Sequence, residues 1–189
     1  MKLISPIKAG AKDAPAFLIV LYYLFVALDL FTTYLATPDM RYEGSWIVRL
    51  FNLNWSQFFI FYSLTVLFVT LGLLIALGYI QKYYQDNTII YNHSLIFEVF
   101  HNKKLLISFI MLGCFYSHVI NLGHIVINNY LSYIYLLRTE SLLYNISTRY
   151  ISNQPLFLFY IQIVPIIIGY VVAAYKVKKI RNKYRTMSM

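Results

Sequence analysis

Four long apolar runs constrain this chain more than any other feature of its sequence. Each is about as long as the 20 residues that an α-helix needs to cross the hydrocarbon core of a bilayer. The runs cover residues 16–36, 55–80, 105–127 and 156–175. The sequence therefore predicts an all-α, polytopic membrane protein, in which residues 1–189 form a single membrane domain, a four-helix transmembrane bundle with interfacial helices.

The composition supports this class and argues against a nucleic-acid-binding protein. Of the 189 residues, 60% are hydrophobic and 12% are charged, which lies outside the usual range for soluble proteins. The net charge of +9 would suit nucleic acid. The cations, however, lie in short segments between the apolar runs, without the aromatic-lined basic groove that single strands require. We therefore expect the lipid bilayer to be a partner of this protein and nucleic acid not to be one. Protein partners or a homo-oligomer are also possible.

The distribution of lysine and arginine predicts the orientation of the spans. Short loops rich in these residues stay on the cytoplasmic side. Four spans place the two termini and the middle loop on one side, with twelve of the 16 Lys and Arg residues. The other side holds only Arg41, Arg49, Arg138 and Arg149. The sequence thus predicts a multi-pass protein with both termini in the cytoplasm.

Two segments between the spans are predicted to lie on the membrane surface. Residues 94–100, Ser-Leu-Ile-Phe-Glu-Val-Phe, suit a short helix on the cytoplasmic side. Residues 130–154 mix apolar clusters with Arg138, Glu140 and Arg149. A fifth span there would place the basic C-terminal tail outside the cell, against the charge rule. We therefore expect this stretch to lie along the outer leaflet.

Ionisable side chains inside the spans are the strongest signal for a functional site. They are costly in lipid and usually face the interior of a bundle. Asp29 and His118 lie seven and nine residues before the outer ends of their spans. At a rise of about 1.5 Å per residue, these offsets correspond to depths of about 10 Å and about 14 Å. Gln162 and Tyr62 lie at a similar depth in the remaining spans, so we expect one polar layer in the outer half of the bundle.

Further polar residues are predicted to support this layer. In the third span, Asn121 and His124 follow His118 at offsets of three and six residues, within one face of the helix about 120° wide. Thr33 lies one turn beyond Asp29, on the same side of the first span. The outer loop that follows contains Glu43, which could fold back over the layer. In the fourth span, Gln162 is the residue that we expect in this polar layer.

The chemistry of Asp29, Glu43, His118 and His124 leaves three hypotheses open. Carboxylate oxygen and imidazole nitrogen can together bind zinc, iron or manganese, as in a metal-dependent membrane enzyme, so a divalent metal is one cofactor to consider. The same groups could exchange protons or hold a cation without a metal. Alternatively, they form only interhelical hydrogen bonds, as expected of an accessory or structural subunit of a membrane complex. No residue is assigned a catalytic role.

The segment Leu28-Asp29-Leu30-Phe31-Thr32-Thr33, with Glu43 and an apolar second span after it, resembles a family of small prokaryotic membrane proteins of unknown function. That family has an Asp and a Thr in the first span and Glu-x-Asn-Pro in the next loop. Asp29, Thr33 and Glu43 match this pattern, whereas Ser45-Trp46 replaces Asn-Pro. The match covers residues 26–74. The resemblance implies a prokaryotic plasma membrane and adds weight to Asp29 and Glu43 as a pair.

Overall fold

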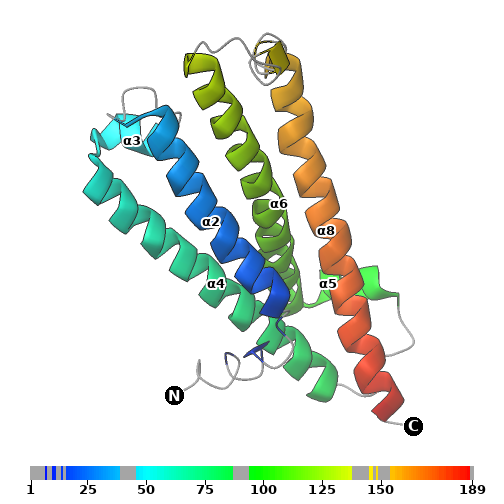
Figure 1. The fold of residues 1–189 in the computed structure, drawn as a ribbon. Coiled ribbons are helices and arrows are strands. Elements are labelled where there is room, and N and C mark those ends of the chain that lie inside the picture. Colours follow the sequence, from blue (N-terminus) through cyan, green and yellow to red (C-terminus); the bar gives the residue numbers. More distant parts are fainter. Residues whose placement is uncertain are drawn as a thin grey trace. The chain divides into compact units, whose positions relative to one another are not determined.

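The regular structure of the described residues is helical. A computed structural model of the chain describes residues 7, 10, 11, 14, 16–38, 46–86, 94–137, 145, 146, 148 and 154–187. The helices are α2 (Ala16–Ala36), α3 (Trp46–Phe51), α4 (Trp55–Asp86), α5 (Leu95–His101), α6 (Lys103–Leu137) and α8 (Gln154–Met187) (Figure 1). The prediction of an all-α protein is confirmed for this part of the chain.

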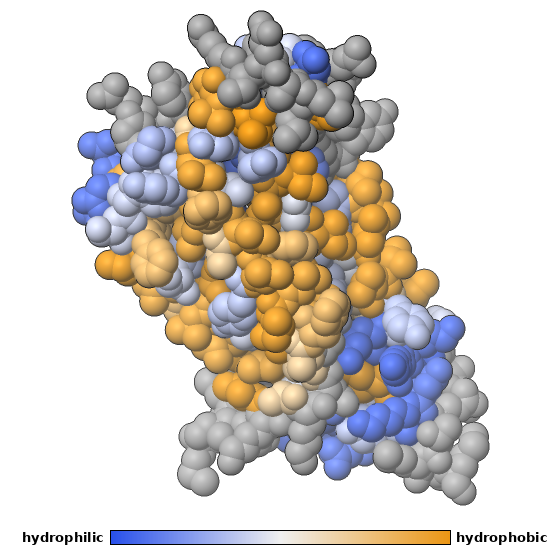
Figure 2. Space-filling model, in the orientation of Figure 1, coloured by the Kyte–Doolittle hydropathy of each residue, from blue (hydrophilic) through white to orange (hydrophobic). Residues whose placement is uncertain are grey.

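Three of these helices, α2, α4 and α6, are long and apolar enough to cross a membrane. They contain 21, 32 and 35 residues, against the roughly 20 that a span requires. Large hydrophobic side chains are exposed along them, such as Phe17, Phe59 and Phe68 at 75%, 56% and 69%. Figure 2 shows such residues over much of the visible face of the protein. Side chains of this kind suit contact with lipid, which indicates a multi-pass membrane protein.

The fourth predicted span lies in α8, but its crossing of the membrane stays a prediction. The backbone of α8 is helical from Gln154 to Met187, so residues 156–175 lie in one helix. The side chains of residues 154–162 lie outside the described part of the structure. Beyond them, Ile167 and Val171 are 58% and 64% exposed, as expected of lipid-facing residues.

Several helices continue past the ends of the predicted spans. The second predicted span ends at Ile80, but α4 continues to Asp86. The third ends at Ile127, but α6 continues to Leu137, so residues 130–137 extend this helix. Hydropathy measures the length in contact with lipid, whereas the backbone hydrogen bonds of a helix persist in water. The ends of the spans and of the helices therefore need not coincide.

The predicted short helix in the middle loop is present as α5, and its ends follow from local hydrogen bonds. Ser94 is the N-cap residue, and its hydroxyl accepts a hydrogen bond from the backbone N–H of Phe97 at 3.2 Å. Asn102 ends α5 in an extended conformation. Its side-chain oxygen accepts from the backbone N–H groups of Lys104 and Leu105, both at 3.0 Å. Asn102 thus separates α5 from α6 and caps the second of them.

The chain divides into two compact units. Unit 1 comprises Met1–Ile19, Phe68–His118 and Pro165–Met189, and unit 2 comprises Val20–Leu67 and Val119–Val164. The four long helices α2, α4, α6 and α8 each contribute one segment to both units. The prediction of a single membrane domain over the whole chain is not tested by this division and stays a prediction.

Within unit 1, α6 and α8 approach each other at small residues. A Cβ atom at Gly169 would collide with Ser117 Oγ and would lie 2.5 Å from the Ser117 backbone nitrogen. At Gly113 it would lie 2.5 Å from the ring of Tyr170. Ser117 donates a hydrogen bond to the carbonyl of Gly113 at 2.8 Å, which satisfies its hydroxyl within α6. Gly113-x-x-x-Ser117 is therefore a small-residue motif that admits a close neighbour, as is common in membrane helices.

Candidate functional site

The candidate site lies in unit 2, on the buried face of α2. The buried residues of this helix are Tyr22, Val26, Asp29, Thr32 and Thr33. Their spacings of four, three, three and one residues place them on one side of a helix with 3.6 residues per turn. Asp29 is 8% exposed, although it lies in a strongly apolar helix. A carboxylate in this setting is costly unless hydrogen bonds satisfy it.

Both carboxylate oxygens of Asp29 accept hydrogen bonds. The hydroxyl of Tyr62 on α4 donates to Oδ2 at 2.5 Å. On the other oxygen, the side-chain amide of Asn129 on α6 donates to Oδ1 at 3.0 Å. The hydroxyl of Thr33, one turn along α2, also lies within hydrogen-bond distance of Oδ1 at 3.4 Å. Three helices therefore contribute donors to one membrane carboxylate, and we call these four residues the Asp29 cluster.

Asn129 and Thr33 are joined to each other as well as to Asp29. The Asn129 Nδ2 donates to Thr33 Oγ1 at 2.9 Å, in addition to its bond with the carboxylate. The neighbouring Thr32 differs, because its hydroxyl donates within α2 to the carbonyl oxygens of Leu28 and Asp29 at 2.8 Å and 3.2 Å. Two adjacent threonines of one helix thus have separate roles. Thr33 contacts the carboxylate, while the described bonds of Thr32 go to the backbone.

The structure brings together part of the predicted polar layer. Asp29 and Thr33 are in direct contact, as the one-turn spacing predicts. Asn121 and His124 are half-buried residues of α6 in the same unit, and His118 belongs to unit 1. Their participation in a common site with Asp29 stays a prediction. Glu43 and the side chain of Gln162 lie outside the described residues.

Asn129 was not predicted as a site residue, and it lies two residues beyond the end of the third predicted span. One signal in the sequence could have identified it. Asn129 follows Asn121 by eight residues and His118 by eleven, so all three fall near one face of a continuous helix. Extending the helix beyond the apolar run would have included it.

The hypothesis of a bound metal is not supported by a cluster of ligands in the part of the chain that the structure describes. There, no group of three or more His, Cys, Asp or Glu side chains is arranged to hold a metal ion. Glu43, one of the four predicted ligands, lies outside these residues. The divalent metal therefore stays an untested hypothesis, and the geometry of Asp29 is interpreted without it.

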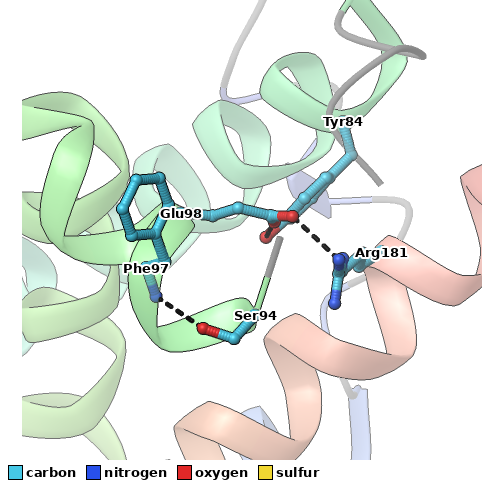
Figure 3. A network of polar contacts seen from close by, with 5 residues as sticks. All are labelled: Tyr84, Ser94, Phe97, Glu98 and Arg181. Atoms are coloured by element: carbon cyan, nitrogen blue, oxygen red, sulfur yellow. Dashed lines mark hydrogen bonds and ion pairs between the residues drawn. The ribbon is translucent and has the colours of Figure 1, made fainter. Parts of the chain in front are cut away.

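A second buried carboxylate, Glu98 on α5, lies in unit 1 and was not predicted (Figure 3). Its side chain is only 1% exposed. Arg181 on α8 donates from Nη2 to Oε1 at 2.8 Å, and Tyr84 on α4 donates from its hydroxyl to Oε2 at 3.1 Å. These bonds tie the short helix α5 to two long helices. We call these three residues the Glu98 cluster.

Comparison with known proteins gives no match to a family model, a curated protein or a solved structure. Asp29 and Glu98, two buried carboxylates of the described residues, are therefore the features that bear most directly on function. Of the two carboxylates, only Asp29 lies within a predicted span.

Proposed function

We propose that this chain is a small multi-pass membrane protein that takes up and releases protons at Asp29. The observation that supports the proposal most strongly is the pair of hydroxyl groups on the two sides of this carboxylate. Tyr62 contacts Oδ2 and Thr33 contacts Oδ1. A hydroxyl can donate and accept a hydrogen bond at once, so it can relay a proton to or from a carboxylate.

The order of the groups suggests a path. Tyr62 is half-buried, whereas Asp29 and Thr33 are buried. When the phenol of Tyr62 gives its proton to Oδ2 of Asp29, it must accept another proton on its other side, and it ends neutral. For release on the other side, the carboxyl group rotates about its Cβ–Cγ bond so that the proton on Oδ2 faces Thr33. The hydroxyl of Thr33 accepts this proton and gives its own proton to water. Asn129 has no proton to exchange at neutral pH and acts as a positioning residue for Oδ1 of Asp29 and Oγ1 of Thr33.

The orientation of the protein follows from its cations. With α8 as the fourth span, twelve Lys and Arg residues lie with the termini and the middle loop, which favours a cytoplasmic location for all three. Asp29 then lies in the outer half of the membrane. The resemblance of residues 26–74 to small prokaryotic membrane proteins favours the prokaryotic plasma membrane.

A second candidate function, an accessory subunit of a membrane complex, is supported by a different property of the same contacts. The bonds of Asp29 join α2 to α4 and α6. Interhelical hydrogen bonds in membrane proteins contribute about 0.6 kcal/mol each on average. A cluster of this kind can hold three helices in register without exchanging a proton. In that case the cluster matters for stability and assembly alone.

Proton flux into liposomes distinguishes these functions. Purified protein is reconstituted with a pH-sensitive dye inside the vesicles, and a pH difference is applied. Asp29→Asn keeps the size of the side chain and removes its ability to bind a proton, so we expect flux to fall by about 100-fold, a typical contribution of an acid–base group. Thr32→Val is the matched control, because the Thr32 hydroxyl bonds to backbone carbonyls, and its flux should equal that of the wild type.

The two candidate functions predict opposite results. Flux in wild-type vesicles that does not exceed that of protein-free vesicles would contradict proton exchange and favour the accessory function. Equal flux in the wild type and in Asp29→Asn would also contradict it, since the carboxylate would then be dispensable.

A further inference from the structure

The short helix α5 presents an exposed apolar face. Ile96, Phe97 and Phe100 are 72%, 44% and 66% exposed. At about 100° per residue they occupy an arc of about 100° on the helix. Glu98 and Val99 lie on the opposite side and are buried in unit 1. A helix with this division of side chains suits the boundary between lipid headgroups and acyl chains.

The Glu98 cluster holds this face in a fixed orientation. In Figure 3, Glu98 points toward Tyr84 and Arg181, whereas the ring of Phe97 points away from them. Because Glu98 bonds to two long helices, α5 cannot rotate about its axis without breaking a buried ion pair. Breaking such a pair is strongly unfavourable. The apolar face therefore remains exposed as a feature of the folded unit.

Two exposed lysines lie close to this face in the sequence. Lys103 and Lys104 follow α5 after Asn102, in the first turn of α6, and both are exposed. The only carboxylate of α5 is Glu98, which is buried against Arg181. The surface thus combines large apolar side chains with exposed ammonium groups and no exposed carboxylate on α5. This combination complements an anionic lipid, whose acyl chains are apolar and whose headgroup carries a negative phosphate.

We propose that α5 and the first turn of α6 bind anionic phospholipids of the bilayer, with Ile96, Phe97 and Phe100 among the acyl chains and Lys103 and Lys104 at the phosphates. We call these five residues the α5 surface. The proposal is independent of proton exchange at Asp29, which lies in the other unit. It explains why a seven-residue helix is held in place by a buried ion pair.

Photo-crosslinking in lipid nanodiscs tests this proposal. Full-length protein is placed in discs that contain a trace of photoactivatable phosphatidylglycerol, which is anionic, or of the same probe with a phosphatidylcholine headgroup, which is neutral overall. Adducts are mapped by mass spectrometry. We expect the anionic probe to label residues 95–104 more than the neutral probe does. Each lysine should increase labelling by the anionic probe about fivefold, as expected for a cation near an anionic membrane surface.

Substitution of the lysines gives the matched comparison. Lys103→Gln with Lys104→Gln should reduce labelling by the anionic probe by about 25-fold, the product of two fivefold contributions, and leave labelling by the neutral probe unchanged. Lys82→Gln is the control, because Lys82 is an exposed lysine of α4 that points away from α5. It lies two residues, or about 200° around the helix, from Tyr84, whose hydroxyl contacts Glu98 of α5. It should not change labelling of residues 95–104.

Three results would overturn the proposal. The first is equal labelling by the two probes, and the second is loss of selectivity in Lys82→Gln but not in the double variant. The third is protection of residues 95–104 from both probes, together with a dimer in the same discs. That result would assign the α5 surface to a second copy of the chain.

Discussion

Asn129 on α6 donates a hydrogen bond to the carboxylate of Asp29 on α2 at 3.0 Å, across 100 residues of sequence. The same amide donates to the hydroxyl of Thr33 at 2.9 Å. One asparagine therefore positions both the carboxylate and one of its two hydroxyl neighbours.

A double-mutant cycle should show that Asn129 and Asp29 are coupled. Asn129→Ala, Asp29→Ala and the double variant are compared by reversible unfolding in mixed micelles. We expect a coupling free energy of about 0.6 kcal/mol, the average for an interhelical hydrogen bond in a membrane protein. Strictly additive effects of the two substitutions would show that the bond does not stabilise the fold.

The hydroxyl of Thr33 should matter for proton flux and that of Thr32 should not. Thr33→Val keeps the shape of the side chain but removes the hydroxyl beside Asp29 Oδ1, so flux should fall. Thr33→Ser restores a hydroxyl and should recover most of the flux, while Thr32→Val should leave it unchanged. The liposome assay measures all three. Equal flux in Thr33→Val and Thr32→Val would remove Thr33 from the path.

Removing one partner of the buried ion pair between Glu98 and Arg181 should strongly destabilise the protein. Arg181→Met leaves Glu98 buried without this cation, so we expect the free energy of unfolding to fall by about 3 kcal/mol. Lys179→Met, an exposed residue of the same helix, is the control and should have little effect. Combining Arg181→Met with Glu98→Leu should restore most of the loss, because both charges are then absent. A double variant no more stable than Arg181→Met would contradict this interpretation.

Close packing at Gly169 should not tolerate a methyl group. The added Cβ of Gly169→Ala would lie 2.5 Å from the backbone nitrogen of Ser117, so the two helices must separate. Overpacking of this kind costs about 1–3 kcal/mol. Gly72→Ala is the matched control in the same unit, since its Cβ would meet only the terminal methyl of Met111, at 3.2 Å, and that flexible side chain can move. Equal thermal stability of the two variants would argue against a close contact.

The sequence predicted helices better than it predicted their ends. The first predicted span, residues 16–36, coincides with α2, because Pro15 and Pro38 flank it and proline disfavours the helix interior. The third predicted span ended ten residues before α6 does. The end of an apolar run marks where lipid contact stops, and nothing in hydropathy marks where the helix stops.

The site was predictable where helical spacing or a common depth in the spans indicates proximity. Tyr62 was expected near the depth of Asp29, and its hydroxyl does contact the Asp29 carboxylate. Asp29 and Thr33 are four residues apart on one helix, so helical geometry brings them together. The contacts of Asp29 with Asn129, and of Glu98 with Arg181, join residues 100 and 83 positions apart. Such pairings depend on how the helices pack. Glu98 also lies in a loop between spans, where a carboxylate would ordinarily be solvated.

Infrared spectroscopy of the reconstituted protein tests most directly whether Asp29 exchanges a proton. A protonated carboxyl group has a C=O stretching band distinct from that of a carboxylate. We predict that such a band appears as pH is lowered across the range in which flux changes, disappears on return, and is absent in Asp29→Asn. A wild-type spectrum that matches that of Asp29→Asn throughout this range would contradict the account.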